Sequence, residues 1–141
     1  MRGCTFFGHR NCPDRLQKIL ERRIENLIAE GVTLFYVGNQ GNFDEMVRHA
    51  LIRSKTKHPQ IQYYVVLAYV PRENQKYGTD ETIIPEGIEC VPRKYALSHR
   101  NRWMIEHSEY VITYVTHSFG GAAQFEKLAR AKGKNIINIA E

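Results

Sequence analysis

The sequence predicts a Rossmann-like α/β fold, a mainly parallel sheet of about five strands between two layers of helices. Short apolar runs alternate along the chain with longer segments whose apolar residues recur at helical spacing, which is typical of βαβ units. The run at 63–70 is almost continuously apolar, as expected of a strand buried on both faces of a parallel sheet. We therefore expect a three-layer sandwich with strand order 3-2-1-4-5 and, because crossovers are right-handed, helices on both faces.

The expected elements follow one another without a linker or an internal repeat, so residues 1–141 are expected to form one domain. Pro13 suits the first turn of a helix, and Gly31 and Gly133 suit helix ends. The predicted strands cover 4–7, 32–37, 63–70, 110–115 and 135–139. The predicted helices run from 13 to Gly31, from about 43 to the segment before Pro59, from about 98 to 107 and from about 122 to 132.

Residues 71–97 break this alternation. They contain three prolines and two glycines, at positions 71, 85 and 92 and at 78 and 87, which favour turns. The segment is expected to be an irregular insertion or an edge hairpin, with a short strand at 88–91 as one option. Lys76, Tyr77 or Arg93 could instead form a lid over a site.

Composition excludes several classes of protein. A chain of 141 residues that is 43% hydrophobic and 25% charged is globular rather than disordered. Its net charge of +5 suits an anionic ligand or weak contact with nucleic acid, although solubility alone would also explain it. No apolar stretch approaches a membrane span of about 20 residues. The chain enters a strand without an apolar leader, and its three cysteines are irregularly spaced, so we expect a cytoplasmic protein.

The loops that leave the predicted strands form the candidate site, because ligands of open parallel sheets bind beyond the carboxyl ends of the strands. Three glycine-containing loops at 8–10, 38–44 and 118–122 lead into helices. Turn geometry alone would explain each loop, but helix N-termini attract phosphate, and three such loops at one edge indicate a site. The predicted ligand-binding residues are Gly8, His9, Arg10, Gly38, Asn39, Gln40, Gly41, Asn42, Asp44, Ser118, Gly120, Gly121 and Ala122.

Several side chains of these loops suit a nucleotide. The guanidinium of Arg10 matches a phosphate, and His9 is expected to donate to a phosphate or to carry a proton. The three amides at 39, 40 and 42 suit hydrogen bonds to a ribose or a base. Asp44 has two open interpretations, contact with the ligand or a carboxylate that complements the helix dipole.

Two residues outside these loops are catalytic candidates. Arg100 lies at a helix start, where a cation costs a few tenths of a kcal/mol, and an anionic ligand would offset that cost. Glu126 could hold ribose hydroxyls or stabilise positive charge at an anomeric carbon, or it could simply pair with Lys127 or Arg130.

No cofactor or metal is expected. The chain has neither a Gly-Lys-Ser/Thr phosphate loop nor a complete G-x-G-x-x-G motif, which argues against simple NTPases and dehydrogenases. Cys4, His9 and Cys12 follow no zinc-binding pattern.

The order and spacing of these segments resemble the SLOG superfamily, a Rossmann-like group that includes the lonely-guy phosphoribohydrolases, the DNA-processing protein A family and the YpsA-like proteins. The similarity is best to the YpsA-like branch and covers nearly the whole chain. It rests on 5–10, on 38–44, on Arg100 before 108–112, and on 120–126. The resemblance implies a nucleotide-type ligand, such as a nucleoside monophosphate or an ADP-ribose derivative.

The same resemblance bears on catalysis. In the lonely-guy enzymes an Arg–Lys pair and a Gly-Gly-x-Gly-Thr-x-x-Glu motif hold the phosphoribosyl group and assist cleavage of the N-glycosidic bond. Arg100 and Glu126 match the arginine and the glutamate. Asn101 replaces the lysine, and Ala122 and Ala123 replace the Gly-Thr pair. The resemblance therefore implies ligand binding more strongly than hydrolysis.

Three functions follow as hypotheses. The first is a sensor or regulatory domain that binds a nucleotide-type small molecule, as a monomer or a homo-oligomer. The second is a phosphoribohydrolase that cleaves the N-glycosidic bond of nucleoside monophosphates. The third is a single-stranded nucleic-acid binder, which ranks last because no row of exposed aromatic residues stands out in the sequence as a stacking platform.

Overall fold

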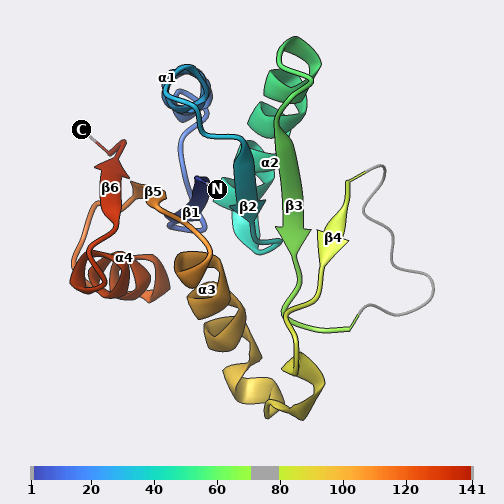
Figure 1. Cartoon of the computed structure of the whole chain (residues 1–141). Coiled ribbons are helices and arrows are strands. Elements are labelled where there is room, and N and C mark those ends of the chain that lie inside the picture. Colours follow the sequence, from blue (N-terminus) through green and yellow to red (C-terminus); the bar gives the residue numbers. More distant parts are fainter. Residues whose placement is uncertain (1, 71–79, 141) are drawn as a thin grey trace.

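A computed structural model of the chain describes residues 2–70 and 80–140. All strand pairs are parallel, and the sheet has the order β4-β3-β2-β1-β5-β6 (Figure 1). The strands are β1 (Gly3–Gly8), β2 (Leu34–Val37), β3 (Gln62–Val66), β4 (Thr82–Ile83), β5 (Tyr110–Tyr114) and β6 (Asn135–Asn138). The helices are α1 (Leu16–Ala29), α2 (Gly41–Lys57), α3 (Ala96–Glu106) and α4 (Gly121–Ala131). The predicted class is confirmed, and the sheet differs from the expected five strands by the additional edge strand β4.

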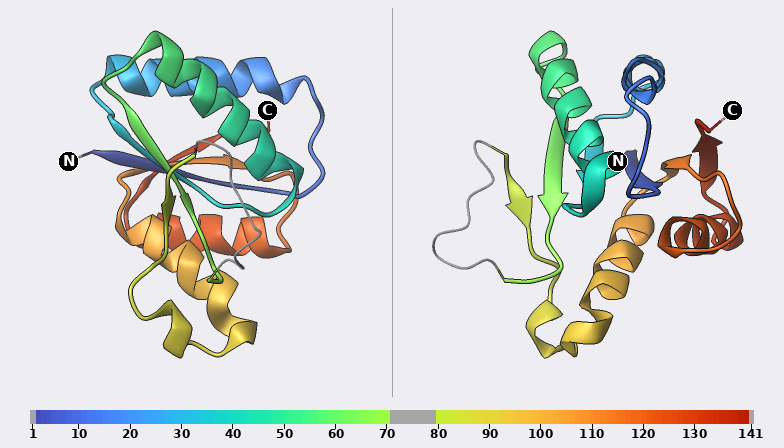
Figure 2. Two further views of the ribbon diagram at one scale, coloured as in Figure 1. Left: turned by 90° about the vertical axis from the view of Figure 1, so that its right-hand side faces the viewer. Right: turned by 180° about the vertical axis from the view of Figure 1, so that it is seen from behind.

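Helices cover both faces of the sheet. Helices α1 and α2 lie on one face and α3 and α4 on the other (Figure 2). The four buried residues of α1, Leu16, Leu20, Ile24 and Leu27, recur at helical spacing and pack in the first layer with Phe35 of β2. The second layer contains Phe7, Val66, Met104, Ile105, Val111 and Phe125. Because the strands are parallel, their carboxyl ends lie at a common edge of the sheet, where loops can build a site.

The segment after β3 differs from the sequence prediction in three ways. Strand β4 pairs in parallel with β3, with Val65 opposite Thr82, so the edge hairpin is wrong because a hairpin requires antiparallel strands. The strand expected at 88–91 is also wrong, since Ile88–Cys90 forms a 3-10 turn after Gly87, whose φ is 80°. Strand β3 ends at Val66 rather than at 70; the apolar residues beyond it include Ala68, which packs against Ile88 and Ala96.

The lid hypothesis concerns the same segment. Lys76 and Tyr77 lie outside the described residues. The guanidinium of Arg93 lies 4.2 Å from the ring centroid of Tyr69. This cation–π contact holds Arg93 against the segment that follows β3.

Asp80 anchors the edge of the sheet. One of its carboxylate oxygens accepts from Nε and Nη2 of Arg48 on α2, at 3.0 and 2.5 Å. The other accepts from the hydroxyl of Tyr63 on β3, at 2.5 Å. The Asp80 side chain is 3% exposed, so these bonds are shielded from water and connect β4 to both the sheet and the helix layer.

Replacing Asp80 with alanine is expected to lower the free energy of unfolding by about 2 kcal/mol, because it leaves the buried hydroxyl of Tyr63 and the Arg48 guanidinium without their acceptor. Urea denaturation measures this change. Glu81→Ala is the matched control, since among the described residues its carboxylate accepts one exposed bond, from Gln62, and its loss should cost well under about 1 kcal/mol. Equal effects of the two variants would contradict this assignment.

Candidate functional site

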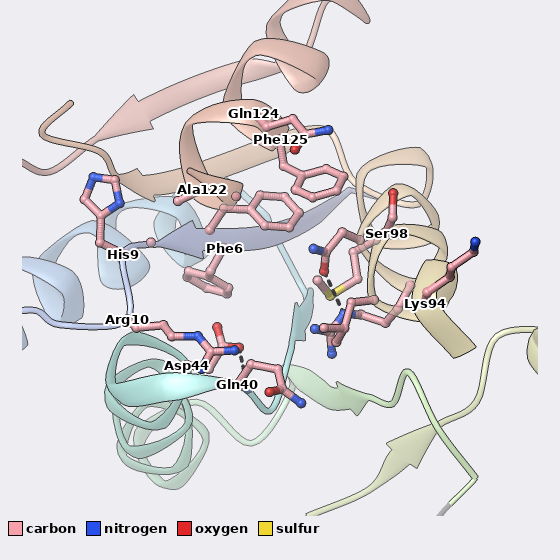
Figure 3. Close-up of a pocket in the computed structure, with 17 residues that line it drawn as sticks. Phe6, His9, Arg10, Gln40, Asp44, Lys94, Ser98, Ala122, Gln124 and Phe125 are labelled. Atoms are coloured by element: carbon pink, nitrogen blue, oxygen red, sulfur yellow. Dashed lines mark hydrogen bonds between the residues drawn. The ribbon is translucent and has the colours of Figure 1, made fainter. Parts of the chain in front are cut away.

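The carboxyl ends of the strands surround a pocket of about 510 Å³, a size typical of small-molecule sites. It lies between the end of β1, the N-terminal turns of α2 and α4, and one face of α3 (Figure 3). Eight predicted site residues line it: Gly8, His9, Arg10, Gln40, Asp44, Arg100, Gly121 and Ala122. The other lining residues are Phe6, Phe7, Lys94, Leu97, Ser98, Asn101, Met104, Gln124 and Phe125, which the sequence reasoning did not assign to the site.

The lining residues carry a surplus of positive charge. Arg10, Lys94 and Arg100 contribute cations, and Asp44 is the carboxylate among them. Arg10, Gln40 and Asp44 lie together on one side of the cavity, whereas the ammonium of Lys94 points outward (Figure 3) and lies 5.1 Å from the ring centroid of the exposed Tyr95. Cations that face a partly enclosed cavity attract anions more strongly than exposed cations do, so the charge of this pocket favours an anionic ligand.

Arg100 is buried at the base of the pocket, with 3% of its surface exposed. Its Nη1 donates to the carbonyl of Val66 at 2.8 Å and to Oδ1 of Asn39 at 3.2 Å. Its Nε donates to Oδ1 of Asn101 at 2.7 Å. These bonds fix the guanidinium plane, and Nη2 makes no hydrogen bond to any residue in the described ranges. Burial lowers the pKa of Arg100, which attraction to Asp44 opposes.

Asp44 has the structural role that the sequence left open. Its Oδ2 accepts from the backbone N–H of Gln40 at 2.9 Å, which caps the first turn of α2. Desolvation raises the pKa of Asp44 to about 6 against the opposing effects of that bond, Arg100 and Arg10. A β-carbon at Gly38 would lie 2.8 Å from Oδ2 of Asp44 and 3.0 Å from Nη1 of Arg100, so glycine allows both charged groups to approach the backbone.

The raised pKa of Asp44 predicts a pH-dependent contribution to stability. The folded-state pKa, about 6, lies above the usual 3.8, so the protonated form favours folding. That contribution is complete below pH 3.8 and is lost as the pH rises through 6. Asp44→Asn keeps the oxygen that accepts from Gln40 and cannot ionise. We expect it to be more stable than the wild type at pH 8 by about 1–2 kcal/mol, with the difference vanishing towards pH 4.

Urea denaturation at both pH values tests this expectation. Glu45→Gln removes a charge from the next, exposed position of α2 and should leave stability unchanged at both. A wild type more stable than Asp44→Asn at pH 8 would show that the ionised carboxylate stabilises the fold.

His9 is the first ring of a stack that the sequence reasoning missed. Its ring lies 3.8 Å from that of His117, with 13° between the planes, and His117 lies 4.0 Å from the ring of Phe119 at 22°. Nε2 of His9 accepts from the backbone N–H of Thr116 at 2.9 Å. Burial and the neighbouring His117 lower the pKa of His9, against the opposing charge of Glu126, and this direction favours the neutral ring that accepts from Thr116.

Glu126 is not among the residues that line this pocket, although its charge raises the pKa of His9, which does line it. Its Oε2 accepts from the hydroxyl of Thr113 on β5 at 2.5 Å, and its Oε1 lies 3.9 Å from Nη2 of Arg130. The side chain is 13% exposed. In this position the carboxylate joins α4 to the sheet, and its placement gives little support to a catalytic role at the pocket.

The remaining predicted residues support the site rather than line it. Asn39 accepts from Arg100, and the N–H of Asn42 donates to the carbonyl of Arg10 at 3.1 Å. Gly41 has a φ of 85°, and a β-carbon there would lie 3.0 Å from Cγ of Arg10, so glycine is required for this close approach. Two others belong to the loop before α4: Ser118, which separates His117 from Phe119, and Gly120, the N-cap residue with a φ of 93°.

The described part of the chain contains neither a metal-binding cluster nor a helix suited to a membrane. Within 2–70 and 80–140, no group of three or more His, Cys, Asp or Glu side chains could hold a metal ion. Cys4 is buried, and desolvation raises the pKa of its thiol. Among the helices of this part of the chain, none has the length and apolar character to cross a bilayer.

The fold and the pocket define a class: a Rossmann-like α/β protein with a basic pocket at the carboxyl ends of its parallel strands. DNA processing protein A from Streptococcus pneumoniae has a similar structure, with a TM-score of 0.69, 18% sequence identity and coverage of 96% of this chain and 49% of that chain. The chain thus has a fold like that of DNA processing protein A and spans about half the length of that protein. No protein-family model matches the chain, and no curated protein matches its sequence.

Proposed function

We propose that the pocket binds a nucleotide-type ligand, a nucleoside monophosphate or an ADP-ribose-like molecule, and that the chain acts as a cytoplasmic sensor or regulatory domain of the YpsA-like kind. The observation that carries the proposal is that Arg10 and the buried Arg100 line one cavity together with the N-terminal residues of α4. A cavity of about 510 Å³ accommodates a ligand of this size.

The N-terminus of α4 is the proposed phosphate site. The first helical hydrogen bond runs from the N–H of Gln124 to the carbonyl of Gly120 at 3.0 Å, so the three N–H groups before it have no acceptor within the helix. The N-cap residue is Gly120, which has no side chain that could cap this end. Gly121 and Ala122 both line the pocket, and their N–H groups suit a phosphate oxygen.

The N-terminus of α2 is less suited to phosphate than that of α4, although the sequence predicted the loops before both helices as ligand-binding. Two of its N–H groups are engaged within the protein, that of Gln40 by Asp44 and that of Asn42 by the carbonyl of Arg10. A carboxylate at this end also repels an anion. We therefore assign the Gly38–Gly41 loop to positioning Arg100 and Arg10, and the Gly120–Gly121 turn to the phosphate.

Single-stranded nucleic acid is a second candidate ligand. The stack of His9, His117 and Phe119 provides the aromatic surface that the sequence reasoning did not find, and the similar structure belongs to a DNA processing protein. Hydrolysis of an N-glycosidic bond has less support, because the Glu126 carboxylate is bound to Thr113 on β5.

Calorimetric titration with ribose 5-phosphate, AMP and ADP-ribose tests the proposal. We expect saturable binding of all three by the folded protein and no binding of ribose, because the phosphate provides the charge that the pocket recognises. Failure of all three phosphate-bearing compounds to bind would overturn the proposal.

A further inference from the structure

We propose that the exposed ring of Phe119 is the stacking site for the base of the ligand, while the phosphate occupies the N-terminus of α4. The inference rests on the proposed function and adds to it the recognition of a planar nucleobase. It requires that the ring stack is ordered, that it is continuous with the pocket and that its outer ring is accessible to a ligand.

The stack leads from the pocket to the surface. His9 lines the pocket, His117 lies between the other two rings, and Phe119 is 70% exposed. Phe119 is the most exposed of the large hydrophobic side chains in the described ranges. An apolar ring in this position remains in contact with water unless something covers it, and a nucleobase would extend the row of parallel rings.

The loop that carries the stack is held at several points. His117 donates from Nδ1 to the carbonyl of Phe119 at 2.9 Å, and Thr116 donates to His9. The side-chain amide of Asn138 on β6 donates to the carbonyl of Val115 at 3.0 Å and accepts from its N–H at 3.2 Å. Because these bonds order the rings before a ligand arrives, binding loses less conformational entropy.

The stack and the proposed phosphate site are close along the chain. Phe119 precedes the first residue of α4 by two positions, so the proposed base and phosphate sites belong to one short turn of the chain. Stacking on phenylalanine uses no hydrogen bonds of the base and is therefore expected to tolerate different bases. A free nucleotide and a unit of single-stranded nucleic acid share this chemistry.

The test compares ligands with and without a base on the wild type, Phe119→Ala and Phe119→Tyr. The probes are ribose 5-phosphate, AMP, a short oligothymidylate and an abasic oligomer of the same length. We expect Phe119→Ala to weaken AMP binding about tenfold while ribose 5-phosphate binding is unchanged, because stacking contributes only when a base is present. Phe119→Tyr keeps an aromatic ring and should restore AMP binding.

Ile52→Ala is the matched control, since Ile52 is another exposed apolar side chain, on α2, and the substitution should change no affinity. If the oligothymidylate binds more tightly than AMP and loses affinity in Phe119→Ala, the base comes from a single strand; if AMP binds more tightly, it comes from a free nucleotide. Unchanged AMP and oligothymidylate affinities in Phe119→Ala, with ribose 5-phosphate still bound, would overturn the stacking site alone. Failure of every probe to bind the wild type would overturn the proposed function as well.

Discussion

Arg100→Gln is expected to weaken the binding of ribose 5-phosphate by about 10- to 100-fold, the largest effect on binding that the structure predicts. The guanidinium is buried at the base of the pocket, fixed by Val66, Asn39 and Asn101. A charge-assisted hydrogen bond in such a place is stronger than one at the surface. Glutamine keeps a donor for the Val66 carbonyl. Because the substitution also removes the cation that attracts Asp44, circular dichroism of the variant is compared with that of the wild type before binding is measured.

Arg102→Gln provides the control for Arg100→Gln. It removes the same charge from the same helix at an exposed position. The two variants therefore have the same net charge. We expect Arg102→Gln to weaken binding less than about twofold, because an exposed cation beyond direct contact is screened by salt. Equal losses in the two variants would mean that net charge, rather than the position of Arg100, determines affinity.

Gly8→Ala is expected to lower the free energy of unfolding by about 3 kcal/mol, the largest loss of stability for a single added methyl group. A β-carbon at Gly8 would lie 2.4–2.7 Å from ring atoms of Phe43, well inside van der Waals contact. Phe43 is 1% exposed within the core, and its ring stacks on Tyr114 with centroids 6.4 Å apart. The ring cannot move without displacing its neighbours, so the clash is relieved only by shifting β1 or α2.

Gly121→Ala is the matched control for this clash. Apart from its chain neighbours and its own helix backbone, no atom of the described residues lies within 4 Å of a β-carbon built there, and the position begins a helix, so its stability should change by less than about 1 kcal/mol. Chemical denaturation of both variants measures the difference. Gly8→Ala combined with Phe43→Leu should recover part of the loss, because the smaller side chain makes room for the methyl group. Equal stabilities of Gly8→Ala and Gly121→Ala would refute the close-packing argument.

The sheet could be predicted because its signals are local. Helical spacing in 16–28 and the apolar run at 63–66 identify their elements without reference to the rest of the chain. Strand β4 has two residues, too few for any periodicity, and its pairing with β3 depends on Asp80 and on contacts distant in sequence. The apolar residues at 88–91 suggested a strand, whereas the positive φ of Gly87 turns the backbone into a 3-10 turn.

The loops of the site could be predicted because they follow strand ends. The contacts between side chains from distant parts of the sequence could not. Gly8 and Tyr114 are opposite each other in the β1–β5 pair, which brings His9 beside His117 although they are distant in sequence. The rings in both loops were visible in the sequence, but only the strand order shows that they meet. Lys94 and Leu97 line the pocket from the end of the irregular segment, which carried no local signal for a site.

The most direct test of the proposed phosphate site is a titration of the ¹⁵N-labelled protein with ribose 5-phosphate, followed by amide chemical shifts. We expect saturable chemical-shift changes that are largest at the N–H groups of Gly121 and Ala122. These groups have no acceptor within α4, and both residues line the pocket. The amides of Gln40 and Asn42, already bonded within the protein, should change less. Largest changes at Gln40 and Asn42, or no saturable change at α4, would contradict the assignment of the phosphate to this helix.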